Sequence, residues 1–96
     1  MGLVCTGYVV QAAGMGTAPA YEELRKLGRA IRRVRCEREL SQEAVARTAG
    51  VHPNQVGRLE RGTADVHTST MLRIVAGIGV SLSDVARAYE EAPRER

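Results

Sequence analysis

Phenylalanine and tryptophan are absent from this sequence, and tyrosine occurs only three times in 96 residues. The apolar interior must therefore be built from leucine, isoleucine, valine, alanine and methionine. Sheets are usually enriched in aromatic and β-branched side chains, so this composition favours compact helices. A chain of this length allows one small domain, which buries a modest share of its surface and would gain from dimerisation. The sequence predicts an all-α fold.

Cysteine and histidine are scarce, with two of each. Cys5 and Cys36 are far apart, and with His52 and His67 they show no metal-ligand spacing such as Cys-x-x-Cys. We expect free thiols in a reducing compartment, no metal and no cofactor. No nucleophile, base and orienting group can be placed together on the expected helices, so we also expect no enzymatic activity.

Long apolar runs are missing as well. No segment approaches the ~20 apolar residues needed to span a bilayer. The first residues lack the basic start of a secretory signal. We therefore expect a cytoplasmic protein with no membrane partner.

The stretch QEAVARTAGVHPNQVGRL, residues 42–59, has the pattern of two short helices joined by a glycine turn. Its apolar residues give each helix one buried stripe, and they are Val45, Ala46, Val51, Val56 and Leu59. Ser41 is a suitable N-cap, and Ala46 is small enough for two helices to cross closely beside it. Gly50 can adopt the left-handed conformation that ends the first helix. This combination predicts a helix-turn-helix.

The longer segment RKLGRAIRRVRCERELSQEAVARTAGVHPNQVGRLERG resembles the lambda-repressor/Cro-like (XRE-type) DNA-binding domain. The resemblance continues through MLRIVAGIGVSLSDV and covers residues 24–85, with LSQE, AG, LERG and GVSLSDV as its most specific pieces. It implies a five-helix lambda-repressor-like DNA-binding domain with a helix-turn-helix. By the same resemblance, Glu60 of the ERG ending forms a structural ion pair with Arg35 of the first helix.

The chain divides into three parts by composition. Residues 1–20 predict an N-terminal arm, residues 21–91 the DNA-binding domain, and residues 92–96 a C-terminal tail. The arm has two interpretations, a flexible leader or a strand over residues 8–11 that pairs with a partner chain. It contains no lysine or arginine, so an arm that enters a DNA groove is not supported.

Apolar spacing predicts five helices within the domain. The first begins near Tyr21, the second runs over residues 42–48, and the third begins at Pro53 and ends before Gly62. The fourth is closed by Gly79. The stripes of the first and fourth helices are Leu24, Leu27, Ile31 and Val34, and Met71, Ile74, Val75 and Ile78.

The fifth helix is capped by Ser81 or Ser83, and its apolar residues have two potential partners. We expect Leu82 and Val85 in the core. The resemblance implies that this helix meets its counterpart in a homodimer, which would suit Tyr89.

Positive charge is concentrated in the first helix, although the formal net charge is only +3. The basic residues there are Arg25, Lys26, Arg29, Arg32, Arg33, Arg35 and Arg38. Such a run alone is often a solvated helix face. Beside a helix-turn-helix, it favours double-stranded DNA as the partner.

The third helix carries the residues that we expect to meet DNA bases, on its outer face near its N-terminus. They are Pro53, Asn54, Gln55 and Arg58. An amide side chain can pair with an adenine edge, arginine with guanine, and proline can touch a thymine methyl. Gln42 matches the family glutamine that holds a backbone phosphate, and we expect Arg61 and Thr63 to contact phosphates as well.

Two residues depart from the family pattern. His52 stands where the family usually has a serine or threonine cap, so the cap is weaker or the imidazole replaces it, and a phosphate contact is a further interpretation. Gly57 costs up to about 1 kcal/mol relative to alanine inside a helix. It either allows close approach of DNA or is simply tolerated.

These residues predict a sequence-specific transcriptional regulator that binds a palindromic operator as a homodimer, with the third helix in the major groove. A small domain of this kind is similar to autoregulators such as restriction–modification controllers. The alternative is an antitoxin or other module that also binds DNA while its arm or tail inhibits a partner protein.

Overall fold

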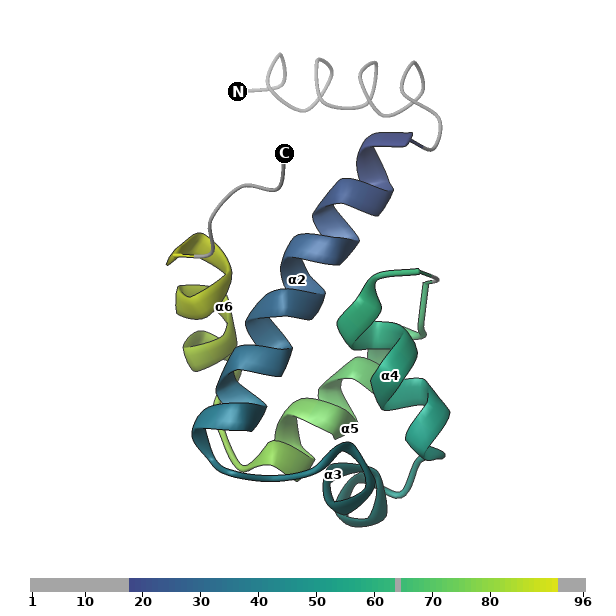
Figure 1. The fold of residues 1–96 in the computed structure, drawn as a ribbon, viewed down its shortest axis with the longest axis vertical. Coiled ribbons are helices and arrows are strands. Elements are labelled where there is room, and N and C mark those ends of the chain that lie inside the picture. Colours follow the sequence, from purple (N-terminus) through teal and green to yellow (C-terminus); the bar gives the residue numbers. More distant parts are fainter. Residues whose placement is uncertain (1–17, 64, 92–96) are drawn as a thin grey trace, which may run out of the picture.

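The computed structural model describes residues 18–63 and 65–91, within which the chain forms five helices and no strand. They are α2 (Ala18–Glu37), α3 (Gln42–Ala49), α4 (Pro53–Arg61), α5 (Thr68–Ile78) and α6 (Leu82–Glu91). In Figure 1 the long α2 runs through the molecule with α6 on one side and α4 on the other. The helices α3 and α5 lie near its C-terminal end. The predicted all-α fold of five helices is confirmed.

The start of α2 differs most from the predicted boundaries. The helix begins at Ala18, inside the segment 1–20 that the sequence assigns to an arm. Pro19 lies in the first turn, where its missing amide costs no helical hydrogen bond, so it does not exclude a helix there. Residues 1–17, the rest of the predicted arm, and residues 92–96, the predicted tail, lie outside the described residues.

The two ends of α3 form as predicted. Ser41 Oγ accepts a hydrogen bond from the Ala44 amide at 3.0 Å. Gly50 has a φ of 75°, in the left-handed region, and its amide donates to the Ala46 carbonyl. These local bonds satisfy backbone groups that a helix end would otherwise leave unpaired.

One apolar core joins all five helices. Its buried members are Ala30, Ile31, Val34, Val45, Ala46, Val56, Leu59, Ile74, Val75, Ile78, Val85 and Ala88. The predicted core position of Val85 is confirmed, but that of Leu82 is wrong, because this side chain is 52% exposed. Leu82 is the first residue of α6, and the buried face of this helix consists of Val85 and Ala88.

Tyr89, which we expected at a dimer interface, is half-buried and engaged by α2. Its hydroxyl donates a hydrogen bond to Glu23 Oε1, and the Lys26 ammonium lies 4.6 Å from its ring centroid. The hydrogen bond to Glu23 and burial raise the pKa of Tyr89 above its usual value. Tyr89 thus joins α6 to α2 within one chain.

Two glycines allow α2 and α4 to cross at backbone distance. A Cβ at Gly28 would lie 2.5 Å from the Leu59 carbonyl oxygen and would also overlap that of Glu60. A Cβ at Gly62, which closes α4 with a φ of 65°, would lie 2.6 Å from backbone atoms of Arg25. Only glycine fits at these contacts, which fix the position of α4 against α2.

Candidate nucleic-acid interface

The recognition helix of the predicted motif, α4, has two distinct faces. Its buried residues are Val56, Gly57, Leu59 and Glu60. On the other face lie the expected base-contacting residues, with Pro53, Asn54 and Arg58 exposed and Gln55 half-buried. The side chains of Asn54, Gln55 and Arg58 make no hydrogen bond or ion pair with the rest of the described chain. Their donors and acceptors are therefore available to a partner.

The start of α4 is capped by an imidazole in place of the hydroxyl usual in the family. His52 Nδ1 accepts a hydrogen bond from the Asn54 amide at 3.0 Å. Pro53 follows in the first helical turn, where proline loses no helical hydrogen bond. Because His52 uses a ring nitrogen as an acceptor, the cap requires this nitrogen to be unprotonated.

A buried ion pair connects α4 to α2. Arg35 Nε lies 2.5 Å from Glu60 Oε2, and Arg35 Nη2 lies 2.9 Å from Glu60 Oε1. The Glu60 residue is 7% exposed, so its carboxylate has little contact with water. Hydrogen bonding to Glu60 raises the pKa of Arg35, although burial opposes this shift. Arg35 also donates to the Leu40 carbonyl at 2.8 Å, which fixes the turn between α2 and α3.

The same carboxylate orients Gln42, the first residue of α3. Gln42 Nε2 donates to Glu60 Oε1 at 2.9 Å, which fixes the side-chain amide. Its carbonyl oxygen, Oε1, lies near Gly57, at 3.6 Å from the position of a hypothetical Cβ there. One amide hydrogen is thus already used within the chain, and the sequence did not predict this contact.

Arg61 extends back along the surface of α4 from its last turn. Its Nη1 lies 2.9 Å from the hypothetical Cβ position of Gly57, on the side where Gln42 Oε1 also lies. Thr63, the third expected phosphate contact, is exposed just beyond the Gly62 cap. The structure brings Gln42 and Arg61 together, whereas Thr63 lies separately beyond the C-terminal end of α4.

A hollow of about 270 Å³ borders the outer face of α4. It is lined by Gln55 and Arg58 from α4 and by Asp65, Val66 and His67 from the segment before α5. His67 is the N-cap residue of α5 but forms no side-chain cap hydrogen bond. Sequence reasoning missed the nearness of this segment to Arg58, because no local pattern shows how a loop folds back.

The basic residues of α2 do not form one shared surface. Arg35 binds Glu60, Lys26 lies over Tyr89, and Arg33 binds carboxylates on α2 and α6. The interpretation of this run as a DNA-binding face therefore holds for at most part of it.

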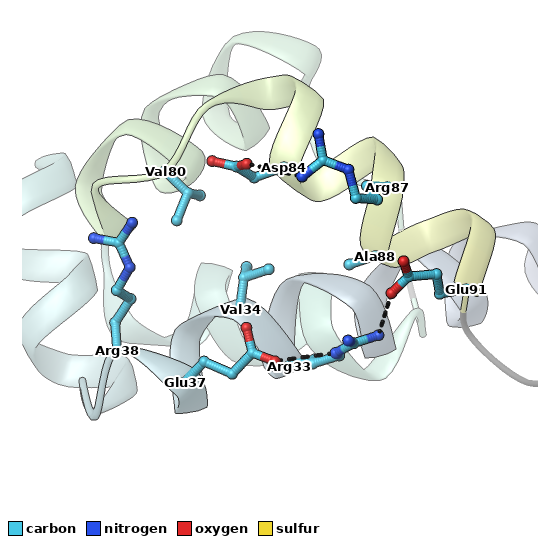
Figure 2. A pocket seen from close by; sticks show the side chains of 9 residues that line it. All are labelled: Arg33, Val34, Glu37, Arg38, Val80, Asp84, Arg87, Ala88 and Glu91. Atoms are coloured by element: carbon cyan, nitrogen blue, oxygen red, sulfur yellow. Dashed lines mark hydrogen bonds and ion pairs between the residues drawn. The ribbon is translucent and has the colours of Figure 1, made fainter.

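A second hollow, of about 260 Å³, lies between the C-terminal half of α2 and α6. Figure 2 shows charged side chains along both helices with apolar ones between them. Arg33 Nε lies 3.1 Å from Glu37 Oε2, and Arg33 Nη1 lies 3.2 Å from Glu91 Oε1. The lining includes three arginines and three carboxylates, namely Arg33, Arg38, Arg87, Glu37, Asp84 and Glu91. This balance of charge ties α2 to α6 and does not favour a polyanion.

The described residues contain no group of three or more histidine, cysteine or acidic residues that could hold a metal ion. None of the five described helices alone has the length and apolar character of a membrane span. Only α5 and α6 taken together meet those limits, and they are bent by 96° at the break between them.

The comparison with protein families gives one match, the helix-turn-helix model, over residues 31–85. This range contains α3 and α4 with the Arg35, Gln42 and Glu60 network. No curated protein matches the sequence.

Among solved structures, the chain is similar to the restriction-modification controller protein C.AhdI from Aeromonas hydrophila, with a TM-score of 0.60 and 29% identity, over 65% of this chain and 94% of that one. It is also similar to the clp gene regulator ClgR from C. glutamicum, with a TM-score of 0.65 and 25% identity, over 71% and 88% of the two chains. A mutant of the controller protein C.Esp1396I shares the fold, with a TM-score of 0.66 at 20% identity over 72% and 90%.

Proposed function

Because this chain belongs to the helix-turn-helix family, whose model it matches over residues 31–85, we propose that it is a sequence-specific DNA-binding transcriptional regulator. It binds a palindromic operator as a homodimer, with α4 in the major groove. The protein works in the cytoplasm and needs no cofactor or catalytic group. Similarity to a restriction-modification controller and to a gene regulator supports this role.

The observation that carries the proposal is the division of α4 into a buried and an uncommitted face. The buried face is held by the core and by Glu60, so the helix is presented rigidly. The outward side chains of Asn54, Gln55 and Arg58 offer the amide and guanidinium groups that pair with adenine and guanine edges. Pro53 supplies an apolar contact for a thymine methyl.

Phosphate contacts by Gln42, Arg61 and Thr63 set the register of α4 in the groove. Each neutralised phosphate releases counterions, so binding weakens steeply as salt rises. Base contacts by α4 provide discrimination of ~1–3 kcal/mol for each good bidentate pair. Affinity and specificity thus depend on different residues.

The homodimer forms through α6. One recognition helix reads only a few base pairs, and two of them about one helical turn apart give useful specificity. Leu82, 52% exposed at the start of α6, is an apolar side chain available for this contact. Ala86 is exposed one turn later on the same helix.

The test is selection from a randomised duplex library, followed by sequencing, with the purified full chain at two salt concentrations. We expect an enriched inverted repeat. Asn54→Ala and Arg58→Ala should relax or abolish the enrichment, because each removes a base-pairing group. Arg33→Ala removes a positive charge that is bound to Glu37 and Glu91, so it serves as the control and should select the same repeat.

Salt-sensitive binding without any enriched repeat would contradict the proposed function. It would favour the alternative of a protein-binding module, such as an antitoxin, that uses the same fold. A protein partner that co-purifies with the chain would then identify this role directly.

A further inference from the structure

Gly57 occupies an unusual place for a glycine, in the middle of α4 and in a buried position. Side-chain atoms from other residues lie nearest to it, whereas backbone atoms lie nearest to Gly28 and Gly62. The atoms nearest to a hypothetical Cβ are Arg61 Nη1 at 2.9 Å, Gln42 Oε1 at 3.6 Å and Arg61 Cζ at 3.7 Å. The space that a side chain would fill is therefore taken by the guanidinium of Arg61.

Arg61 lies four residues after Gly57, so both are on the same face of the helix. Arg61 makes no hydrogen bond or ion pair with other described residues. Nothing within the described chain therefore neutralises its charge. An unneutralised guanidinium is well suited to a phosphate, whose oxygens match its planar fork of donors.

Gln42 borders this space from the neighbouring helix. Its amide is fixed by Glu60, which is itself held by Arg35, so the side chain has one orientation. Its second amide hydrogen is not used by that bond. The amide oxygen of Gln42 and the guanidinium of Arg61 thus lie around one point, next to Gly57.

We propose that Gly57 is a positioning residue, whose missing side chain lets Arg61 fold back along α4 toward Gln42, where its guanidinium binds a backbone phosphate of DNA. This inference rests on the proposed function and assigns a specific site within it. It replaces the two interpretations from the sequence, in which Gly57 either makes room for DNA itself or is merely tolerated.

A double-mutant cycle separates these three explanations. We expect Gly57→Ala and Arg61→Ala each to weaken duplex binding roughly tenfold, as for loss of one charge-assisted contact. The slope of log affinity against log salt should fall by about one in each. The double variant should bind like Arg61→Ala alone, because the added methyl group acts only by displacing that arginine.

Two outcomes of this cycle would overturn the proposal. If Gly57→Ala still weakens binding when Arg61 is already alanine, the methyl group clashes with DNA directly. If Gly57→Ala binds like the wild type, the glycine is merely tolerated. Arg33→Ala is again the charge control and should leave the salt slope unchanged.

Stability and geometry provide readouts that do not need DNA. Alanine is the better helix former, and the atom it displaces is the end of a flexible side chain, so the melting temperature of Gly57→Ala should equal or exceed that of the wild type. A lower melting temperature would overturn the proposed mechanism. NMR of the free protein should show a nuclear Overhauser effect between the Gly57 Hα protons and the Arg61 side chain, and its absence would do the same.

Failure of the proposed function would look different. The wild type would then bind no duplex even at low salt. Its Overhauser effect would still be present, and the melting temperature of Gly57→Ala would still be no lower than that of the wild type. That result would overturn the phosphate role together with the function, but it would leave the placement of Arg61 by Gly57 established.

Discussion

The carboxylate of Glu60 connects three helices through one side chain. It binds Arg35 of α2 and Gln42 of α3 while it projects from α4, and little water reaches it. A charge in such a position depends on its partners, because solvent cannot replace them. Glu60 is therefore important both for stability and for the orientation of Gln42.

Replacing Glu60 by alanine should lower the free energy of unfolding by ~3–5 kcal/mol, because Arg35 then keeps a partly buried charge without its carboxylate. Urea unfolding followed by circular dichroism measures this loss. The control is Arg33→Ala, which breaks two exposed ion pairs, to Glu37 and to Glu91, and should have little effect. Equal stabilities of the two variants would contradict the structural role of Glu60.

The pairing of Arg35 with Glu60 follows from the family motif, whereas the side-chain directions around it do not. Arg61 is the last residue of α4, so the sequence predicts a phosphate contact at the C-terminal end of this helix. Its guanidinium instead lies beside Gly57, because the direction of a long side chain depends on the space left by neighbours on other helices. For the same reason, the hydrogen bond from Gln42 to Glu60 could not be predicted.

The N-terminus of α6 is held by a reciprocal pair of hydrogen bonds. The Asp84 amide donates to Ser81 Oγ at 3.1 Å, and the Ser81 amide donates to Asp84 Oδ2 at 3.0 Å. The backbone hydrogen bond from Ser81, followed by that from its hydroxyl, lowers the pKa of Asp84 below its ordinary 3.8. This capping box begins the helix and orients its first turn.

Asp84→Ala should lower the melting temperature at neutral pH, because it removes the charged acceptor of the cap. Because the pKa of Asp84 is lowered in the folded state, the stabilisation by its charge is fully present above pH 3.8. It is lost as the pH falls through the pKa of the folded state. The difference in melting temperature should therefore narrow in acid. Glu90→Ala, which removes an exposed carboxylate from the same helix, is the control. A difference that stays constant down to the lowest pH would contradict the role of the Asp84 charge.

Helix positions were predictable where local signals agree, as at Ser41 and Gly50, which define α3 almost completely. Helix positions were less predictable where two local signals compete. Pro19 and the nearby glycines suggested an arm, yet proline is compatible with a first helical turn, and α2 begins at Ala18. Either Ser81 or Ser83 fits the sequence as a cap of α6, and only the structure distinguishes them.

The molecule as a whole presents two surfaces with different chemistry. The N-terminus of α3 and the outer face of α4 carry polar and basic groups, whereas α6 begins with an exposed leucine. Composition could not predict this separation, because Leu82 has the same apolar character as the buried Val85. It is the packing of α6 on α2 that decides which of them faces outward.

Leu82→Glu should convert the proposed dimer to a monomer in sedimentation velocity, since a charge would be buried at the α6 contact. Operator binding should weaken in parallel, as each monomer reads one half-site. Leu72→Glu is the matched control, because it places the same charge at an exposed leucine of α5. A Leu82→Glu protein that sediments as a dimer would exclude α6 as the interface.

The free outer face of α4 has a consequence for how such a regulator can diverge. Since Asn54, Gln55 and Arg58 form no side-chain hydrogen bonds or ion pairs with the described chain, substitutions there sacrifice no such contact. Gene copies could therefore acquire new binding sites by drift at these positions while the folded scaffold stays the same. Paralogues would then become insulated from one another's promoters without passing through an unstable intermediate.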